Sequence, residues 1–245
     1  MKTLGVWWLA GEDVFTFKVN PPAENYTITK RSFLSRISTL FDPIGFLSPF
    51  TIRAKVLLQE IWAAGLEWDD DLDIDLMIKA QRWFAELIDL GKIRVPRCLQ
   101  LPQEVVSVNL HTFVDASQDA YGAVTYARST YATNLVSCRM VAAKSRVAPL
   151  TSTSISRLEL MGAIVGLRLK ETISEVLGIM LNQVVFWSDS MNVLWWIRNQ
   201  SRKFKPFVAN RVGEIQTSTN PEQWRYVPTK ENPADLVTIG VTAVD

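Results

Sequence analysis

The sequence predicts an α/β layer fold over residues 104–245, preceded by a smaller, mostly helical segment over residues 1–103. Strand-like and helix-like patterns alternate along the second part, which is typical of strands and helices packed in layers. The first part instead begins with short strand-like runs and continues with helical periodicity. At 245 residues with 48% apolar residues, the chain can bury one large core or two modest ones.

The first part is predicted to contain two strands and three helices. Residues 2–19 read as two strands joined by a turn at residues 10–13. Helices are expected from residue 29 to the Asp-Pro-Ile-Gly sequence at 42–45, over residues 49–64, and over residues 76–90 with Gly91 as the stop. The acidic residues 67–75 are expected to connect the last two helices. The proline-flanked residues 96–102 are the best linker candidate.

The second part is predicted to contain five strands and three helices. The strand-like runs are residues 105–114, 122–126, 139–143, 184–187 and 223–227. The helical runs are residues 154–177, 191–198 and 207–217. The long first helix is amphipathic, and its apolar stripe is expected to comprise Leu158, Met161, Val165, Leu169, Ile173 and Val176.

Charge and cysteine content exclude several classes of protein. With 26 Lys and Arg against 25 Asp and Glu, the chain lacks the basic excess of a protein that binds nucleic acid by charge alone. Cys98 and Cys138 are isolated, so no disulfide framework is implied and a reducing intracellular compartment is expected. The apolar residues 4–10 are read as a strand rather than a signal peptide, and no run is long enough to span a membrane.

Four carboxylates stand in four different settings along the second part. They are Asp115 in FVDAS, Glu159 in SRLEL, Asp189 in FWSDS and Asp235 in ENPAD. Phosphodiester hydrolysis with two Mg²⁺ ions requires a carboxylate cluster that holds the metals about 4 Å apart. Mg²⁺ prefers hard oxygen ligands, so His and Cys are not required. Because clustered like charges are unfavourable without metals, such a set indicates function rather than stability.

Each carboxylate also has a structural interpretation when it is taken alone. Asp115 could cap the turn after a strand, and Asp189 could cap the helix that begins near residue 191. Glu159 could be a solvated helix residue near Arg157, and Asp235 could be a turn or cap residue. The conjunction of all four favours the metal-dependent chemistry.

The motifs carry a specific resemblance. The second part resembles the ribonuclease H domain of reverse-transcribing elements, and the whole chain is similar to the Pol polyprotein of BEL/Pao retrotransposons. The strings that support it are LGVWW, KRSFLSRISTLFDPIGFLSPF, IRVPR, HTFVDAS, SRLELMGA, FWSDS and VPTKENPADL. The pairing of STLFDPIGFLSP with a later NPAD is specific, whereas VDAS or SDS alone is weak.

The resemblance implies a ribonuclease H-like mixed five-stranded sheet flanked by helices. It implies that Asp115, Glu159, Asp189 and Asp235 bind two Mg²⁺ or Mn²⁺ ions and cleave the RNA strand of RNA/DNA hybrids endonucleolytically during reverse transcription. The expected partners are the hybrid and the remainder of the Pol polyprotein, with no membrane. The expected location is the cytoplasm, with a virus-like particle or the nucleus as alternatives.

The sequence departs from the family pattern at one position. Many ribonucleases H carry a His in the loop before the last Asp, where it aids proton handling and product release. This chain has Thr229-Lys230-Glu231 there, and its single histidine, His111, lies in the first predicted strand as an expected structural side chain. Turnover is therefore expected to be slow or to depend on Glu231 or Lys230.

The first part resembles the end of a reverse transcriptase, with the last palm strands followed by thumb and connection helices. A polymerase needs an Asp-Asp pair on a β-hairpin. The one look-alike, within residues 67–70, has no bracketing strands, so the polymerase active site is expected to be absent.

The candidates for nucleic-acid binding are basic residues after the third carboxylate, although a solvated loop is an equally good interpretation: Arg198, Arg202, Lys203 and Lys205. Two alternative functions remain. A non-catalytic relic or nucleic-acid-binding module of a Pol polyprotein is the stronger one. An aspartic peptidase is the weaker one. The Pao family carries the label peptidase, yet no Asp-Thr-Gly or Asp-Ser-Gly sequence is present.

Overall fold

The chain is described by a computed structural model that covers residues 2–3, 6–19, 22, 26–180 and 183–244. It divides into two compact units. The first unit comprises residues 1–43, 49–98 and 240–245, and the second comprises residues 44–48 and 99–239. The first unit therefore includes the C-terminal residues 240–245, and the second unit includes residues 44–48, which lie within the sequence of the first. The predicted division into residues 1–103 and 104–245 does not include these two exchanged segments. The division stays a prediction.

The first unit contains a small antiparallel sheet of four strands in sequence order: β1 (Lys2–Thr3), β2 (Val6–Leu9), β3 (Val14–Thr16) and β4 (Val95–Pro96). The predicted turn at residues 10–13 joins β2 to β3. Leu4 and Gly5, which belong to the predicted strands at residues 2–19, lie outside the described residues. Strand β4 was not predicted, because Pro96 opens the predicted linker and Val95 directly precedes it.

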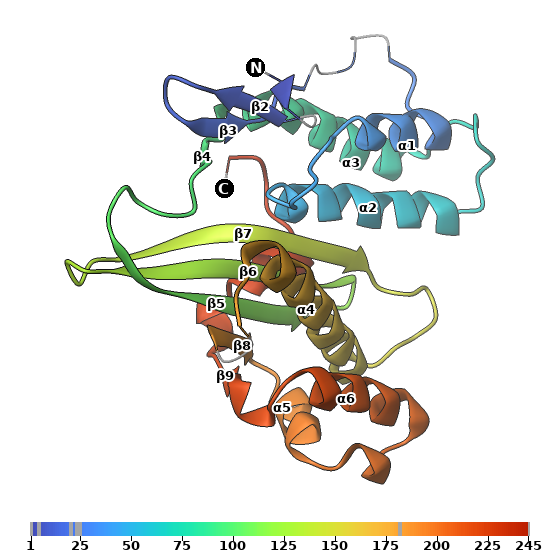
Figure 1. Ribbon diagram of the computed structural model, residues 1–245. Coiled ribbons are helices and arrows are strands. Elements are labelled where there is room, and N and C mark those ends of the chain that lie inside the picture. The colour runs from blue at the N-terminus through green and yellow to red at the C-terminus, as the bar shows by residue number, and fades with distance from the viewer. Residues whose placement is uncertain (1, 4–5, 20–21, 23–25, 181–182, 245) are drawn as a thin grey trace. The chain divides into compact units, whose positions relative to one another are not determined.

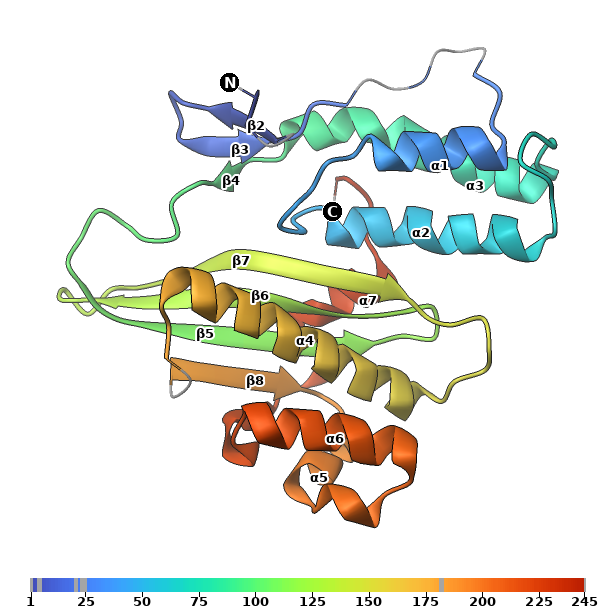
Figure 2. The same ribbon diagram turned by 45° about the vertical axis from the view of Figure 1, so that its right-hand side comes forward.

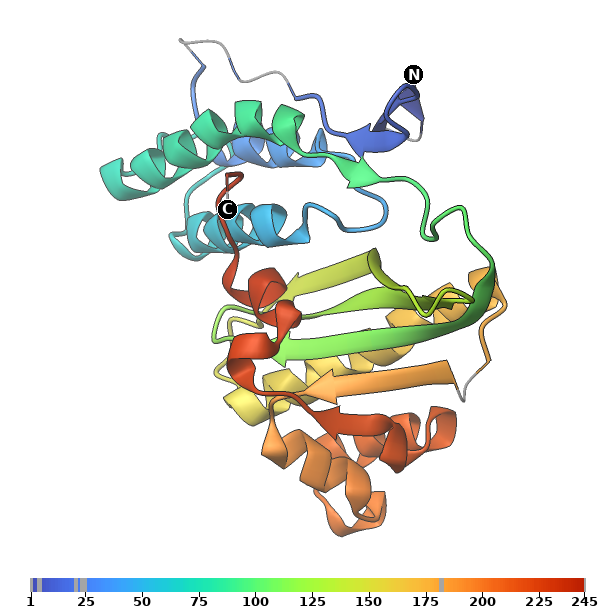
Figure 3. The same cartoon turned by 90° about the vertical axis from the view of Figure 1, so that its left-hand side faces the viewer.

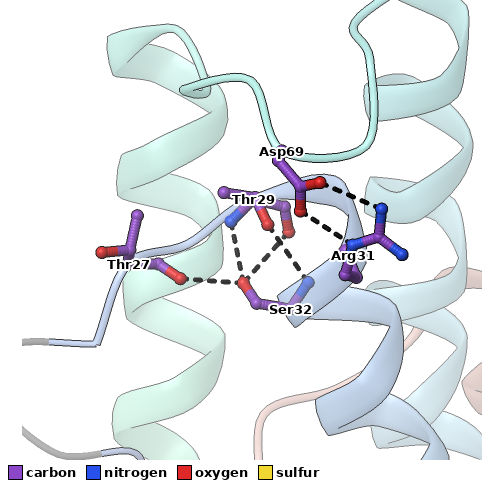
Figure 4. A network of polar contacts seen from close by, with 5 residues as sticks. All are labelled: Thr27, Thr29, Arg31, Ser32 and Asp69. Carbon is purple, nitrogen blue, oxygen red and sulfur yellow. Dashed lines mark hydrogen bonds and ion pairs between the residues drawn. The ribbon is translucent and has the colours of Figure 1, made fainter.

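Helix α1 (Lys30–Ser38) begins at a reciprocal cap that its sequence encodes. The Thr29 hydroxyl accepts a hydrogen bond from the backbone N–H of Ser32 at 3.2 Å, and the Ser32 hydroxyl accepts one from the backbone N–H of Thr29 at 2.8 Å (Figure 4). Beside this cap, Arg31 donates two hydrogen bonds to the Asp69 carboxylate at 2.8 and 2.9 Å. The cap fixes the start of the helix, and the ion pair ties it to the acidic connection.

Helix α2 (Ser48–Ala63) lies close to its predicted bounds, whereas α3 (Ile74–Ala85) ends before its predicted end at residue 90. The interior of the first unit is aromatic, and the Phe50 and Trp83 rings stack with centroids 4.9 Å apart. The prediction that Gly91 ends the third helix is wrong. The α-helix ends at Ala85 and tightens into the 3-10 helix η1 (Glu86–Lys92), which runs through Gly91, because i to i+3 bonds are common in the final turns of a helix.

The second unit is built on a mixed five-stranded sheet, as the resemblance implied. Its strand order is β7-β6-β5-β8-β9 (Figure 1). Strands β5 (Val105–Ala116), β6 (Ala120–Tyr131) and β7 (Val136–Val147) are antiparallel neighbours. Strands β8 (Val184–Ser188) and β9 (Trp224–Tyr226) join β5 in parallel. The first three strands are each longer than predicted because their ends carry polar residues.

Helix α4 (Ile155–Leu177) packs across one face of this sheet (Figure 2). Two glycines allow the close approach. A methyl group added at Gly162 would stand 2.7 Å from the Asp115 carbonyl oxygen, and one added at Gly166 would stand 2.5 Å from Val114 Cγ1. The predicted apolar stripe is wrong at its end, because Val176 is 77% exposed. The middle of α4 is buried on more sides than one stripe, since α5 and α6 also pack against it.

The remaining elements are helical segments that follow β8 in the chain. They are α5 (Met191–Arg198), η3 (Ser201–Lys203), α6 (Pro206–Ser218), η4 (Pro221–Gln223), η5 (Thr229–Glu231), η6 (Pro233–Asp235) and α7 (Leu236–Ile239). On the sheet face opposite α4, η6 and α7 cover the end toward which β5 points (Figure 3). Within the described ranges, no helix combines the length and apolar composition that a membrane span requires.

Candidate active site

Asp115 and Asp189 stand side by side at the carboxyl ends of two parallel strands. Val114 in β5 is the register partner of Ser188 in β8, and each aspartate is the next residue along its strand. Adjacent strands lie about 4.8 Å apart, so the two carboxylates are brought together by the sheet itself. Asp115 is buried, whereas Asp189 is half-buried.

Glu159 reaches the same edge from helix α4. It lies about one helical turn before Gly162, where the helix meets the backbone of Asp115. The hydroxyl of Ser190, the residue after Asp189, donates a hydrogen bond to Glu159 at 2.5 Å. The close packing of the glycine face therefore sets where this carboxylate stands.

Asp235 arrives from the C-terminal segment, which is anchored to both strands. The buried Asn232 side chain donates hydrogen bonds to the Val114 carbonyl oxygen at 3.2 Å and to the Asp189 carboxylate at 3.4 Å. The buried Thr238 hydroxyl donates a short hydrogen bond to the Asp115 carboxylate. These contacts hold η6 and α7 against the ends of β5 and β8, and they place Asp235 close enough to Asp115 and Asp189 for the charges to interact.

The capping roles that each carboxylate could have had alone are performed by other residues. The turn after β5 is closed by the Ser117 hydroxyl, which accepts from the backbone N–H groups of Asp119 and Ala120 at 3.2 and 3.1 Å. The N-cap of α5 is Ser190 rather than Asp189. The N-cap of η6 is Asn232 rather than Asp235. Asp115 and Asp189 are thus not needed to close the turn after β5 or to cap α5.

The electrostatics of the site show that the carboxylates act on one another. Burial raises the pKa of Asp115, and the nearby charges of Asp189 and Asp235 raise it further, against the Thr238 hydrogen bond that lowers it. Burial also raises the pKa of Glu159, with Asp189 and Asp115 adding to the shift and the Ser190 hydrogen bond opposing it.

The pKa of Asp235 is raised by burial and then by Asp189. Asp189 is therefore the carboxylate whose charge acts on each of the other three.

The donor set suits a divalent cation in its chemistry. Four carboxylates from four elements supply hard oxygen ligands, and their mutual repulsion is relieved by a positive charge. As the side chains stand, however, no three His, Cys, Asp or Glu residues in the described part of the chain form a group that could hold one metal ion. Asp115 and Glu159 face hydroxyl donors instead. The residues fit Mg²⁺ in type and charge.

Three residues of this site were not predicted from the sequence. Ser190 and Asn232 could have been found, because Ser and Asn directly before a helical run are cap signals. Thr238 carries no such signal, because its role depends on α7 folding back over β5 across 123 positions of sequence.

The loop before Asp235 is open to solvent. Lys230 and Glu231 are exposed in η5, with no described ion pair to either. His111 lies on β5 and accepts a hydrogen bond from Trp187 Nε1 at 3.0 Å, which agrees with a structural side chain.

The four predicted basic residues lie on and after α5. Arg202, Lys203 and Lys205 are exposed, on η3 and just before α6. Arg198 donates a hydrogen bond to the Trp224 carbonyl oxygen at 3.4 Å. The four are thus neighbours in sequence, but Arg198 is partly engaged with β9.

Comparison with known proteins gives one family. A model described as the Pao retrotransposon-like RNaseH-like domain matches residues 29–190. The match includes Asp115, Glu159 and Asp189 and ends before Asp235. No curated protein matches the chain.

Solved structures with similarity to the chain are remote. The N-terminal RNase H domain of a Mycobacterium tuberculosis protein, fused to maltose-binding protein, is 17% identical and has a TM-score of 0.31. The similarity covers 51% of this chain and 86% of that one. LC11-RNase H1, isolated from compost and solved with an RNA/DNA hybrid, is 13% identical over 52% and 89% of the two chains, with a TM-score of 0.33. Prototype foamy virus protease-reverse transcriptase is 13% identical over 93% of this chain and 28% of that one, with a TM-score of 0.33.

Proposed function

The chain belongs to the Pao retrotransposon-like RNaseH-like domain family, and on that premise we propose that it is a metal-dependent ribonuclease H of a retrotransposon. It hydrolyses the RNA strand of RNA/DNA hybrids endonucleolytically during reverse transcription. The observation that carries this proposal is the convergence of four carboxylates at the carboxyl ends of β5 and β8, with the Asp189 charge acting on the other three. A cluster of carboxyl groups with raised pKa values in this setting is typical of a functional site and supports the proposal.

The residues that would hold two Mg²⁺ or Mn²⁺ ions are Asp115, Glu159, Asp189 and Asp235. When bound, the ions supply an activated water and stabilise the leaving oxygen. Thr238 and Ser190 orient two of the carboxylates through hydrogen bonds. Asn232 keeps the Asp235 segment against β5 and β8, so it is a positioning residue.

The hybrid would be held beside this site by Arg202, Lys203 and Lys205, with a smaller part for Arg198. Exposed cations on a loop suit the phosphate backbone, which fixes position without reading sequence. Residues 1–103 would represent the end of the polymerase palm and the thumb and connection helices of the Pol polyprotein, which guide the hybrid and have no chemistry of their own.

A non-catalytic nucleic-acid-binding module is the second candidate function. It is favoured by one observation, which is that the carboxylate side chains in the described residues form no ready group of metal ligands. The two functions differ in whether divalent metal produces cleavage.

The test is cleavage of a labelled RNA/DNA hybrid with Mg²⁺ or Mn²⁺, with a chelator control. Asp189→Asn should abolish cleavage, because it removes a negatively charged oxygen ligand from the centre of the carboxylate set. Asp119→Asn is the matched control, since Asp119 is exposed in the turn after β5 and should leave the rate unchanged. A folded wild-type protein that binds hybrid without cutting it in either metal would overturn the nuclease and leave the binding module.

A further inference from the structure

A strip of aromatic and cationic side chains lies on the sheet face opposite α4, and the proposed nuclease does not use it. In register, His111 pairs with Tyr126, Phe113 with Trp187, and Trp187 with Arg225. Because side chains alternate between faces, these residues point away from Thr112 and Val114, which contact α4 near Gly166. We call this surface the aromatic strip, and it comprises His111, Phe113, Tyr126, Arg128, Trp187 and Arg225.

Three rings of the strip are nearly parallel to one another, whereas the Tyr126 ring stands edge-on to Phe113 at 86°. The Trp187 ring is inclined by 13° to both His111 and Phe113, with centroids 6.0 and 5.9 Å away. Trp187 Nε1 donates to His111 Nδ1 at 3.0 Å, so the neutral imidazole keeps its proton on Nε2 as a further donor. All three side chains are half-buried, which leaves part of each ring accessible.

Two cations flank these rings without an acidic partner. The Arg225 guanidinium lies 5.9 Å from the Trp187 ring centroid, and Arg128 donates a hydrogen bond to the Thr130 hydroxyl at 3.2 Å. In the described part of the chain, neither arginine takes part in an ion pair. Burial first, and then the charges of Arg128 and Arg225, lower the pKa of His111 and keep it neutral. The positive field of the strip is therefore available to an anionic ligand.

We propose that the aromatic strip binds single-stranded nucleic acid, with bases against the rings and phosphates against Arg128 and Arg225. Phe113 and Tyr126 also pack against Ala234 and Val237, so the strip offers partly exposed rings rather than a bare surface. Partly exposed aromatic rings beside cations without an acidic partner are the combination that holds an unpaired strand. At one end the strip leads along β5 and β8 to Asp115 and Asp189, where η6 and α7 cover the sheet (Figure 3). This function is separate from the nuclease and does not rest on it.

The experiment measures fluorescence anisotropy of labelled oligo(U) and oligo(dT) strands of about 12 nucleotides, with chelator present so that no metal site contributes. Arg128→Gln/Arg225→Gln should weaken binding of both strands by about tenfold and reduce the salt slope by about 1.4, the value for two single-strand phosphate contacts. Trp187→Leu should weaken binding by about tenfold through lost stacking. Lys144→Gln/Arg146→Gln removes the same charge from two exposed residues of β7 outside the strip and should change the affinity less than about twofold.

The two strands distinguish the source of the ligand. Equal affinity for oligo(U) and oligo(dT) would support recognition through bases and phosphates, and tighter RNA binding would support an added contact to the 2′-hydroxyl. The proposal is overturned if the wild-type protein binds neither strand. It is also overturned if Arg128→Gln/Arg225→Gln binds as tightly as wild type. The same holds if Lys144→Gln/Arg146→Gln loses as much affinity as Arg128→Gln/Arg225→Gln. Arg128→Gln/Arg225→Gln should keep the thermal unfolding midpoint of the wild type, which would show that the loss of binding is not caused by unfolding.

Discussion

At the scale of single residues, the burial of Asp115 destabilises its charged form and so raises the pKa of its carboxyl group. A carboxyl group whose pKa is higher in the folded chain than in the unfolded chain binds its proton more tightly when folded. It therefore stabilises the fold below its unfolded pKa, and this contribution is lost as the pH rises through the folded pKa. Asp115, Glu159 and Asp235 all have raised pKa values. Part of the stability present at mildly acidic pH should be lost at neutral pH.

Asp115→Asn should remove part of this pH dependence. The amide keeps an acceptor for Thr238 but carries no charge, so the free energy of unfolding at neutral pH should rise by about 1 kcal/mol. The thermal midpoint should rise by about 2–4 °C. Thermal unfolding in chelator at acidic and neutral pH measures this. Asp119→Asn, on an exposed carboxylate, should change stability by less than about 0.5 kcal/mol. Equal effects of the two variants would contradict the prediction.

Thr238→Val should raise the pKa of Asp115 further, because the lost hydroxyl is the donor that favours the charged carboxylate. The acidic limb of the pH–cleavage profile should then move to higher pH, since Asp115 must be charged to bind metal. The profile of Thr217→Val, which removes an exposed hydroxyl bonded only to the Gly213 carbonyl oxygen, should coincide with wild type. An unmoved acidic limb in Thr238→Val would show that this hydrogen bond does not tune the site.

What the sequence could predict at this scale was limited to residue type. Paired aspartates at the ends of apolar strands are visible in the motifs around Asp115 and Asp189, because Asp115 is the last residue but one of β5 and Asp189 directly follows β8. The contact of Thr238 with Asp115 is not visible, since it depends on how the last segment folds over the sheet. The assignment of the four carboxylates to metal binding stays a prediction.

At the scale of elements, the approach of α4 to the sheet depends on the absence of a side chain at Gly162. Gly162→Ala would place its methyl group 2.7 Å from the Asp115 carbonyl oxygen, and backbone cannot give way as a flexible side chain can. The variant should lose about 1–3 kcal/mol of stability, and it should also lose cleavage activity because Glu159 moves with the helix.

Gly213→Ala is the matched control for this prediction. It also lies inside a helix, α6, but its methyl group would meet only Ser201 Oγ at 3.9 Å. Alanine favours the helix over glycine, so this variant should gain about 0.5–1 kcal/mol. Urea unfolding measures the change in the free energy of unfolding of both variants, which should fall for Gly162→Ala and rise for Gly213→Ala. A rise in both would show that α4 can move away from the sheet without loss of stability.

Element prediction succeeded where the periodicity was local. Helix α5 has its predicted bounds, and α4 differs from its prediction by one residue. Strands β6 and β7 extend well past their apolar middles, because polar residues such as Arg128 and Lys144 pair in the sheet while facing solvent or a partly open face. Pattern alone cannot show how far such a pair of strands continues.

At the scale of the whole molecule, the last residues of the chain belong to the first unit. The Arg53 guanidinium holds the Glu86 carboxylate at 2.5 and 2.9 Å and also donates to the Val241 carbonyl oxygen at 3.1 Å. Arg53→Met should release residues 240–244 and cost about 2 kcal/mol, because the pair is largely buried and charged. Hydrogen exchange of the Val241 amide, which donates to the Pro49 carbonyl oxygen, should become faster.

Arg31→Gln provides the comparison, because it breaks a pair of similar geometry whose side chains are 60% and 70% exposed. It should cost less than about 1 kcal/mol and leave the Val241 exchange rate unchanged. If both variants accelerated exchange equally, the tail would be held by the general stability of the unit and not by Arg53.

The segment at residues 44–48 has a different consequence, which concerns aggregation. Strand β7 stands at the outer edge of the five-stranded sheet, and the Ile44 carbonyl oxygen accepts a hydrogen bond from the backbone N–H of Ala143 in that strand. An exposed sheet edge is a template on which a second chain can add a strand. A fragment that begins after the linker would lack this cover. It would offer β7 to its neighbours, so the nuclease-like unit depends on a short upstream segment to stay monodisperse.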